Sequence, residues 1–178
     1  MKYLLLALIL PFSVSAHIID VNNDAEFSSH PQMIEKEKYA ETTDPEYKTA
    51  LTRHVVFFDL KDSVTESQRE EIIHRFLELR NSTRYGKLYI HNIEVGHGNI
   101  SREGVGKGYD VSFIVSFLSQ GDLNYYVGQP AISDPKFYDP MHQAFKEFVG
   151  PFLKVKKNPD GSDNVGVLVF DYQLTSVD

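Results

Sequence analysis

The chain has 178 residues, a formal net charge of −7 and no cysteine. Without cysteine, no disulfide, thiolate metal site or cysteine nucleophile can form. A nucleic-acid-binding protein normally carries a basic stripe, so the acidic balance argues against a nucleic-acid partner.

The first residues have the pattern of a cleavable signal peptide. Lys2 supplies a positive charge, residues 4–12 form an apolar run, and the small residue Ala16 precedes the expected cleavage point. The run is too short to span a bilayer, and no other stretch reaches the roughly 20 apolar residues of a spanning helix. We therefore expect residues 1–16 to direct a secreted, extracellular protein without a membrane span; an uncleaved anchor is the alternative.

Residues 17–50 are acidic and show no sustained apolar period. Eight acidic residues stand against three lysines, and two prolines interrupt the segment. This composition is typical of a solvated arm. We expect the arm to be disordered, with room for a short helix near residues 32–39.

The folded domain is expected over residues 51–174. Residues 53–60 are rich in β-branched and aromatic side chains, which indicates a strand. Thr65 and Gln68 have the spacing of a capping box, which predicts a helix that runs to about residue 80. The alternation over residues 87–95 predicts a second strand.

The second half of the domain also has the pattern of strands and helices. Five glycines between residues 96 and 108 predict a flexible connection, and the clearest strand follows at residues 109–118. Helices are expected at 121–129 and 141–153, and a last strand at 165–173. The order β-α-β-β-α-β predicts an α+β fold with an antiparallel sheet, the ferredoxin-like pattern.

Several segments in this order resemble the stress-responsive α/β barrel family, also called Dabb domains. The resemblance covers residues 52–172 and is carried by His54–Lys61, Thr65–Glu71, Gly98–Ser101, Gly108–Phe113, Tyr126 with Gln129–Pro130, His142–Phe145 and Val169–Tyr172. It implies a homodimer in which two four-stranded sheets pack face to face into a dimeric α/β barrel. The partner's sheet is then expected to cover the wholly apolar face of the strand at residues 109–118.

The resemblance also implies that each subunit keeps a cavity between its sheet and its helices. We expect Val56, Phe58, Val111 and Phe113 to line this cavity. An apolar cavity favours a small hydrophobic ligand, and we expect no cofactor.

Some members of the family are polyketide cyclases, which close a ring by an aldol reaction and use cavity histidines and a tyrosine without a metal. The resemblance places these roles on His54, Tyr126 and His142. Histidine suits acid–base chemistry because its pKa lies near neutrality. Val111 stands where the cyclase has a further histidine, and the stretch between Pro130 and His142 is longer here.

The sequence therefore predicts a secreted homodimer that binds a small hydrophobic ligand or acts in stress or defence. The alternative is a cofactor-free, cyclase-like lyase that uses His54, Tyr126 and His142. His54 could equally be a satisfied histidine that lines the cavity, and packing and helix capping would also account for Tyr126 and His142. A third reading is an interaction protein whose acidic arm contacts a partner.

Two N-glycosylation sequons begin at Asn81 and Asn99, each in a predicted connection. Both are expected to carry glycans if the source is a eukaryote. His91, Glu94 and His97 lie close together, but they do not have the ligand spacing of a metal site. We expect no metal.

Overall fold

The structure is a computed structural model, and it describes residues 32–174. The predicted signal peptide and residues 17–31 of the arm lie outside the described residues. The four main strands are β1 (Thr49–Phe58), β4 (Asn92–His97), β5 (Val111–Ser119) and β8 (Val167–Gln173). They form one antiparallel sheet in the order β4-β5-β1-β8. The prediction of an α+β, ferredoxin-like fold is confirmed, because the first and third main strands lie in the middle of the sheet.

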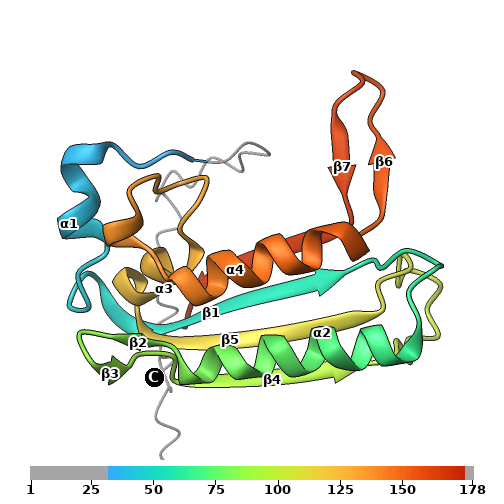
Figure 1. Ribbon diagram of the computed structural model, residues 1–178, viewed down its shortest axis with the longest axis horizontal. Coiled ribbons are helices and arrows are strands. Elements are labelled where there is room, and N and C mark those ends of the chain that lie inside the picture. The colour runs from blue at the N-terminus through green and yellow to red at the C-terminus, as the bar shows by residue number, and fades with distance from the viewer. Residues whose placement is uncertain (1–31, 175–178) are drawn as a thin grey trace, which may run out of the picture. The chain divides into compact units, whose positions relative to one another are not determined.

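The longer helices cover one face of this sheet (Figure 1). They are α2 (Glu66–Glu78), α3 (Gln120–Val127) and α4 (Pro140–Val149). Thr65 and Gln68 form the predicted capping box at the start of α2, with the Gln68 amide donating to Thr65 Oγ1. Among residues 32–174, no helix is long and apolar enough to cross a membrane.

The remaining elements are short. They are η1 (Lys36–Lys38), α1 (Tyr39–Thr42), η2 (Leu79–Asn81), β2 (Thr83–Arg84), β3 (Lys87–Leu88), η3 (Pro135–Phe137), η4 (Gly150–Phe152), β6 (Val155–Lys157) and β7 (Asp163–Val165). The strands β6 and β7 form a hairpin that projects from the body of the molecule (Figure 1). Gly161 closes its turn at φ +85°, a left-handed conformation that glycine adopts without steric cost.

The prediction of a single strand at residues 87–95 is wrong. The chain instead forms β3, which pairs with β2, and then leaves strand geometry before β4 begins at Asn92. Between them, Ile90 is buried and Tyr89 donates its hydroxyl to the Asp139 carboxylate. These long-range contacts determine the backbone here, although the local alternation of apolar and polar residues favours a strand.

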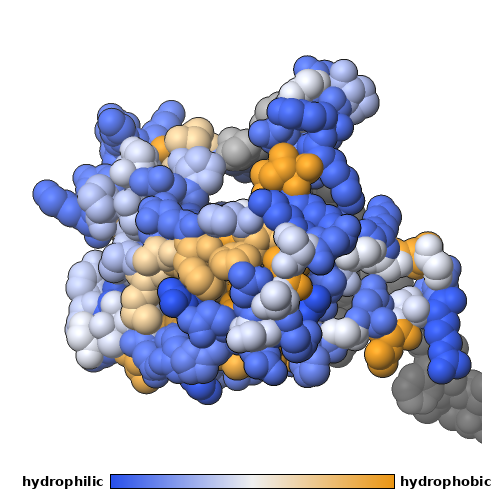
Figure 2. Space-filling model, turned by 45° about the vertical axis from the view of Figure 1, so that its right-hand side comes forward, coloured by the Kyte–Doolittle hydropathy of each residue, from blue (hydrophilic) through white to orange (hydrophobic). Residues whose placement is uncertain are grey.

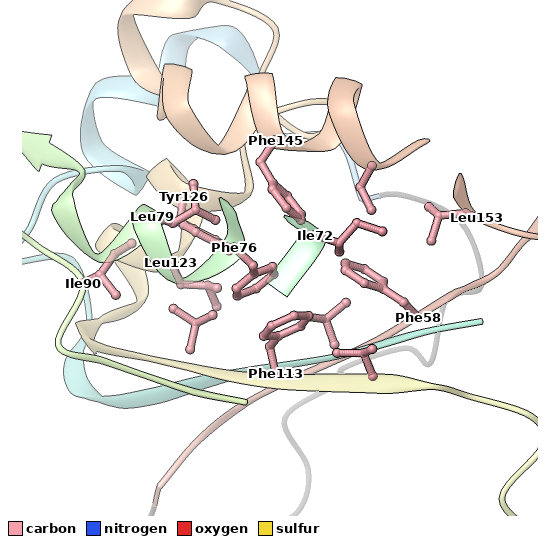
Figure 3. Packing of buried hydrophobic residues seen from close by; sticks show 14 of the residues in the cluster. Phe58, Ile72, Phe76, Leu79, Ile90, Phe113, Leu123, Tyr126, Phe145 and Leu153 are labelled. Atoms are coloured by element: carbon pink, nitrogen blue, oxygen red, sulfur yellow. The ribbon is translucent and has the colours of Figure 1, made fainter. Parts of the chain in front are cut away.

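The core lies between the sheet and its own helices. Phe58 from β1, Phe113 from β5, Phe76 from α2 and Phe145 from α4 point toward one another there (Figure 3). The rings of Phe76 and Phe113 stack with centroids 3.7 Å apart. Val111, Phe113, Val115 and Phe117 are at most 2 % exposed. The expectation that a partner covers this face of β5 is therefore wrong, since helices of the same chain cover it.

The opposite face of the sheet has no cover among the described residues. Its apolar side chains are half-buried or exposed, and they are Val55, Phe57, Ile114, Leu118, Leu168, Phe170 and Tyr172. Figure 2, turned by 45° from the view of Figure 1, shows an apolar patch that is surrounded by hydrophilic side chains. Large contiguous apolar patches on protein surfaces mark interaction sites.

Residues 32–48 are folded onto the domain, which corrects the prediction of a disordered arm for this stretch. Tyr39 is 2 % exposed, and the Ser133 amide donates to its hydroxyl at 3.2 Å. The Ile34 amide donates to the Ala131 carbonyl, and Asn124 Nδ2 donates to the Thr42 carbonyl at 2.7 Å. One buried aromatic ring and these hydrogen bonds offset the acidic composition that suggested disorder.

The N-terminus of α4 is fixed by the buried carboxylate of Asp139. This side chain accepts the Met141 amide at 2.8 Å, which caps the helix. It also accepts the hydroxyls of Ser82 at 2.7 Å and Tyr89 at 2.5 Å. The start of α4 is thereby tied to the segment that follows α2.

Gly121 provides a test of the docked N-terminal segment. A Cβ atom at this position would lie 1.7 Å from the Asp44 carbonyl oxygen, so Gly121→Ala must displace the segment. We expect a loss of about 1–3 kcal/mol in stability and faster tryptic cleavage at Lys36 and Lys38.

The matched control is Gly150→Ala, because a Cβ atom there meets nothing within 4 Å. Limited proteolysis followed by mass spectrometry measures both variants. Equal cleavage rates at Lys36 and Lys38 in the two variants would show that residues 32–48 are not held as described.

Candidate functional site

A cavity of about 280 Å³ lies between α4 and the half of the sheet formed by β1 and β8. Larger hollows occur elsewhere, but this cavity brings together both histidines that the sequence analysis selected. Its lining is His54, Val56, Phe58, Phe76, Val127, Gln129, His142, Phe145, Lys146, Val149, Leu153, Val167, Val169 and Asp171. Val169, on the edge strand, is 48 % exposed, so the cavity has access to solvent beside β8.

The register of the sheet pairs His54 with a carboxylate. His54 and Asp171 are direct neighbours on the antiparallel strands β1 and β8. The distance from His54 Nδ1 to Asp171 Oδ1 is 2.7 Å, and the His54 side chain is 7 % exposed. A carboxylate acceptor at Nδ1 holds the proton there and leaves Nε2 as the nitrogen that can accept a proton.

His142 is held in the same tautomer by a backbone group. Its Nδ1 donates to the Tyr126 carbonyl oxygen at 2.5 Å, which leaves Nε2 as an acceptor. Burial, and next the neighbouring His54, hold the pKa of His142 well below its usual 6.5. His142 is therefore a neutral imidazole at neutral pH.

Tyr126 lies behind the cavity rather than on its lining. Its ring stacks on His142, with centroids 3.7 Å apart and planes 12° apart, and lies 5.4 Å from the His54 ring. The Tyr126 hydroxyl is buried and has no hydrogen-bond partner among the described residues. Burial raises the pKa of this hydroxyl well above 10. The three selected residues form one cluster, but only the two histidines line the cavity.

Three polar residues of the lining were not selected from the sequence: Gln129, Lys146 and Asp171. Lys146 donates from Nζ to the carbonyl oxygens of Val127 at 2.9 Å and Gln129 at 2.6 Å. Lys146 follows His142 by four residues, so helical spacing alone could have placed both on one face. Asp171 could have been found from the pairing of the first and last strands.

Two of the four residues predicted to line the cavity do so, and the prediction is wrong for Val111 and Phe113. Val56 and Phe58 line the cavity beside α4. Phe113 is fully buried in the core beneath it. Val111 borders a different hollow of about 620 Å³, under the glycine-rich loop between β4 and β5.

Both predicted glycosylation residues are exposed, in keeping with their place in connections. Asn81 Nδ2 donates to Glu78 Oε2 at 2.9 Å. Asn99 Oδ1 accepts the Ser101 amide at 2.9 Å within the loop. Glycosylation at either residue stays a prediction. Among residues 32–174, no group of His, Asp or Glu side chains has an arrangement that could hold a metal ion.

Comparison with known families identifies the class of domain. Residues 52–174 match the Stress responsive A/B Barrel Domain, or Dabb, family. This match covers more than half of the chain, and the protein belongs to that family. The residues that carry the cavity, from His54 to Asp171, all lie inside the matched range.

Three solved structures show what the chain is similar to. A crystal structure of an Arabidopsis thaliana protein is 25 % identical, with a TM-score of 0.50, over 71 % of this chain and 98 % of that one. Hydroxynitrile lyase from Passiflora edulis is 17 % identical, with a TM-score of 0.51, over 73 % and 98 %. A dimeric ferredoxin-like protein from Jannaschia sp. is 16 % identical, with a TM-score of 0.49, over 70 % and 99 %. The likeness to the Passiflora edulis enzyme concerns the fold alone.

The neutral state of His142 predicts how stability depends on pH. The unfolded chain binds a proton at His142 below about pH 6.5, whereas the folded protein does so only at lower pH. His142 therefore makes the folded state less stable as the pH falls from 6.5, by up to about 1.4 kcal/mol per pH unit. Above pH 6.5 this penalty is absent.

Urea unfolding at pH 7.5, 6.5 and 5.5 measures this dependence. We expect His142→Asn to flatten it, because the amide keeps a donor for the Tyr126 carbonyl but does not titrate. His74→Gln is the control, since His74 is exposed on α2. Equal slopes in wild type and His142→Asn would contradict the assignment of a neutral His142.

Proposed function

We propose that this protein binds a small amphipathic molecule in the cavity between α4 and the β1–β8 half of the sheet. One observation carries the proposal: the polar side chains of the lining gather at one end. Along the paired strands β1 and β8, His54 lies opposite Asp171 at that end, and Phe58 lies opposite Val167 at the other. His54, His142, Lys146, Gln129 and Asp171 form the polar end. The apolar end is lined by Phe58, Phe76, Phe145, Val149, Leu153 and Val167.

The polar end suits a ligand head group that accepts hydrogen bonds, and a hydroxyl on the ligand would also find acceptors there. The two histidine Nε2 atoms are acceptors for a hydroxyl, while Lys146 and Gln129 supply donors. The apolar end, with several aromatic rings, suits a hydrocarbon chain or a flat ring. A role in stress or defence agrees with the name of the family and stays an expectation.

The proposed active form is a secreted homodimer. Secretion rests on the signal-peptide pattern of residues 1–16. Dimerisation is supported by the uncovered face of the sheet, where Leu118, Leu168 and Phe170 are 54 %, 41 % and 52 % exposed. A second copy of the same face would bury these side chains, and each square ångström of apolar surface removed from water contributes about 25 cal/mol.

A second candidate function is abstraction of a proton next to a carbonyl group, as a cofactor-free lyase would require. The observation that favours it is the His54–Asp171 pair. The carboxylate orients the imidazole and holds its proton on Nδ1, so that Nε2 can act as a general base. Tyr126 contributes no hydroxyl to the cavity and the Nε2 of the neutral His142 carries no proton, so Lys146 is the group beside His54 that could donate a proton.

Native mass spectrometry tests the binding proposal. Protein from its own host is expected to appear as a dimer with a bound small molecule on each subunit. We expect Val169→Trp, which places a large ring in the cavity, to lose the bound mass. Val155→Trp is the control, because Val155 is exposed on the β6–β7 hairpin and does not line the cavity.

Retention of the small molecule by Val169→Trp would contradict binding in this cavity. A monomer in the same spectra would contradict the proposed dimer without affecting the cavity.

Exchange of α-protons tests the lyase candidate. Wild-type protein with 2-octanone in D₂O is expected to accelerate loss of the α-proton signals in the NMR spectrum if His54 is a general base. His54→Gln should then lose about 10²–10⁴-fold of that acceleration, whereas His91→Gln, an exposed control, should retain it. A wild-type rate equal to that of solvent would exclude this candidate and leave the binding proposal in place.

A further inference from the structure

The polar end of the cavity contains an ammonium group that no carboxylate neutralises among residues 32–174. Lys146 Nζ donates only to the carbonyl oxygens of Val127 and Gln129. Both acceptors are uncharged, and no ion pair is formed by Lys146 within the described part of the chain. An ammonium has three N–H groups, so one remains for a further acceptor.

The nearest acids in sequence and in the cavity are used elsewhere. Glu147 is exposed, and its Oε1 accepts Gln143 Nε2 at 3.0 Å. Asp171 lines the cavity but accepts from His54 at 2.7 Å. Burial lowers the pKa of Lys146, and the charge of Glu147 opposes this as the smaller cause. The lowered pKa indicates that the surrounding groups do not compensate the ammonium for its lost hydration.

The position of Lys146 allows a ligand in the cavity to supply the negative charge that no described carboxylate gives to this ammonium. Lys146 and His142 are four residues apart on α4, and Phe145 and Val149 continue the cavity wall toward the apolar end. The ammonium is held at the carbonyls of Val127 and Gln129, two residues of the polar end of the lining, and the apolar wall continues from there along α4. Attraction between opposite charges is stronger in such a partly buried place than in water.

We propose that Lys146 selects a small apolar carboxylate as the ligand. The carboxylate accepts the third Nζ hydrogen and supplies the missing negative charge, while the hydrocarbon part fills the apolar end of the cavity. This inference rests on the proposed function, because it concerns the occupant of the same cavity.

A singly charged carboxylate fits better than a phosphate group. Lys146 is the one lysine or arginine in the lining, and the histidine beside it, His142, is neutral. A phosphate dianion would bring two negative charges against one positive charge, and Asp171 would repel it more strongly than it repels a single carboxylate. A single carboxylate balances the lysine.

Binding of three eight-carbon probes tests the proposal: octanoate, 1-octanol and octylamine, measured at pH 7 by isothermal titration calorimetry. We expect wild-type protein to bind octanoate about tenfold or more tightly than 1-octanol, because hydrogen bonds between charged groups are the stronger kind. Octylamine is expected to bind most weakly. Lys146→Met should weaken octanoate about tenfold and leave 1-octanol within about twofold.

Further variants separate the effect of the Lys146 charge on binding from an effect on the structure. Lys146→Arg should keep the preference for octanoate, and Lys87→Met, which changes an exposed lysine on β3, should behave as wild type. Lys146→Gln replaces Lys146→Met if the methionine variant unfolds, since an amide can still donate to the two carbonyls.

The outcomes distinguish the inference from the proposed function. Equal binding of octanoate and 1-octanol by wild type, or equal weakening of both by Lys146→Met, would overturn the selection of a carboxylate and leave the cavity as a binding site. If none of the three probes binds the wild-type protein, the binding function itself is overturned.

Discussion

The structure depends on the register of β1, which lies between β5 and β8 in the middle of the sheet. This register places His54 opposite Asp171 and, on the same face, Val56 and Phe58 under α4. A shift of one residue would turn every β1 side chain to the other face of the sheet. The apolar residues of β1 and β5 that pack in the core therefore fix the polar pair as well as the fold.

The polar end of the cavity is held by bonds that also close the helical layer. His142 and Lys146 both donate to carbonyl oxygens at the end of α3 or just after it. Those carbonyls would otherwise be unsatisfied, as at any helix C-terminus. Asp139 caps the other side of this junction. Because each donor is committed to the backbone, the remaining nitrogen of His142 and the remaining hydrogen of Lys146 are fixed in direction before a ligand arrives.

Local pattern predicted the fold better than the site. The period of β5, the capping box at Thr65 and the element order are properties of neighbouring residues, and the structure contains them. The resemblance brought out His54 and His142, but not the carboxylate and the ammonium beside them. The docking of residues 32–48 was missed because it depends on contacts of Tyr39 with residues about ninety positions away. Composition alone reports the acidic character of that segment and not the one ring that anchors it.

The size of the cavity limits how much affinity its apolar end can supply. Seven buried methylene or methyl groups contribute about 5–6 kcal/mol, while association costs at least about 4 kcal/mol in lost freedom of motion. The difference corresponds to binding weaker than millimolar. Useful affinity must therefore come from the polar end, where one charge-assisted hydrogen bond adds about 1.5–3 kcal/mol. The same argument applies to a lyase, since its substrate must also be held by these groups before His54 can act on it. The residues at the polar end consequently decide which molecule this member of the family recognises, whether it then reacts or only binds.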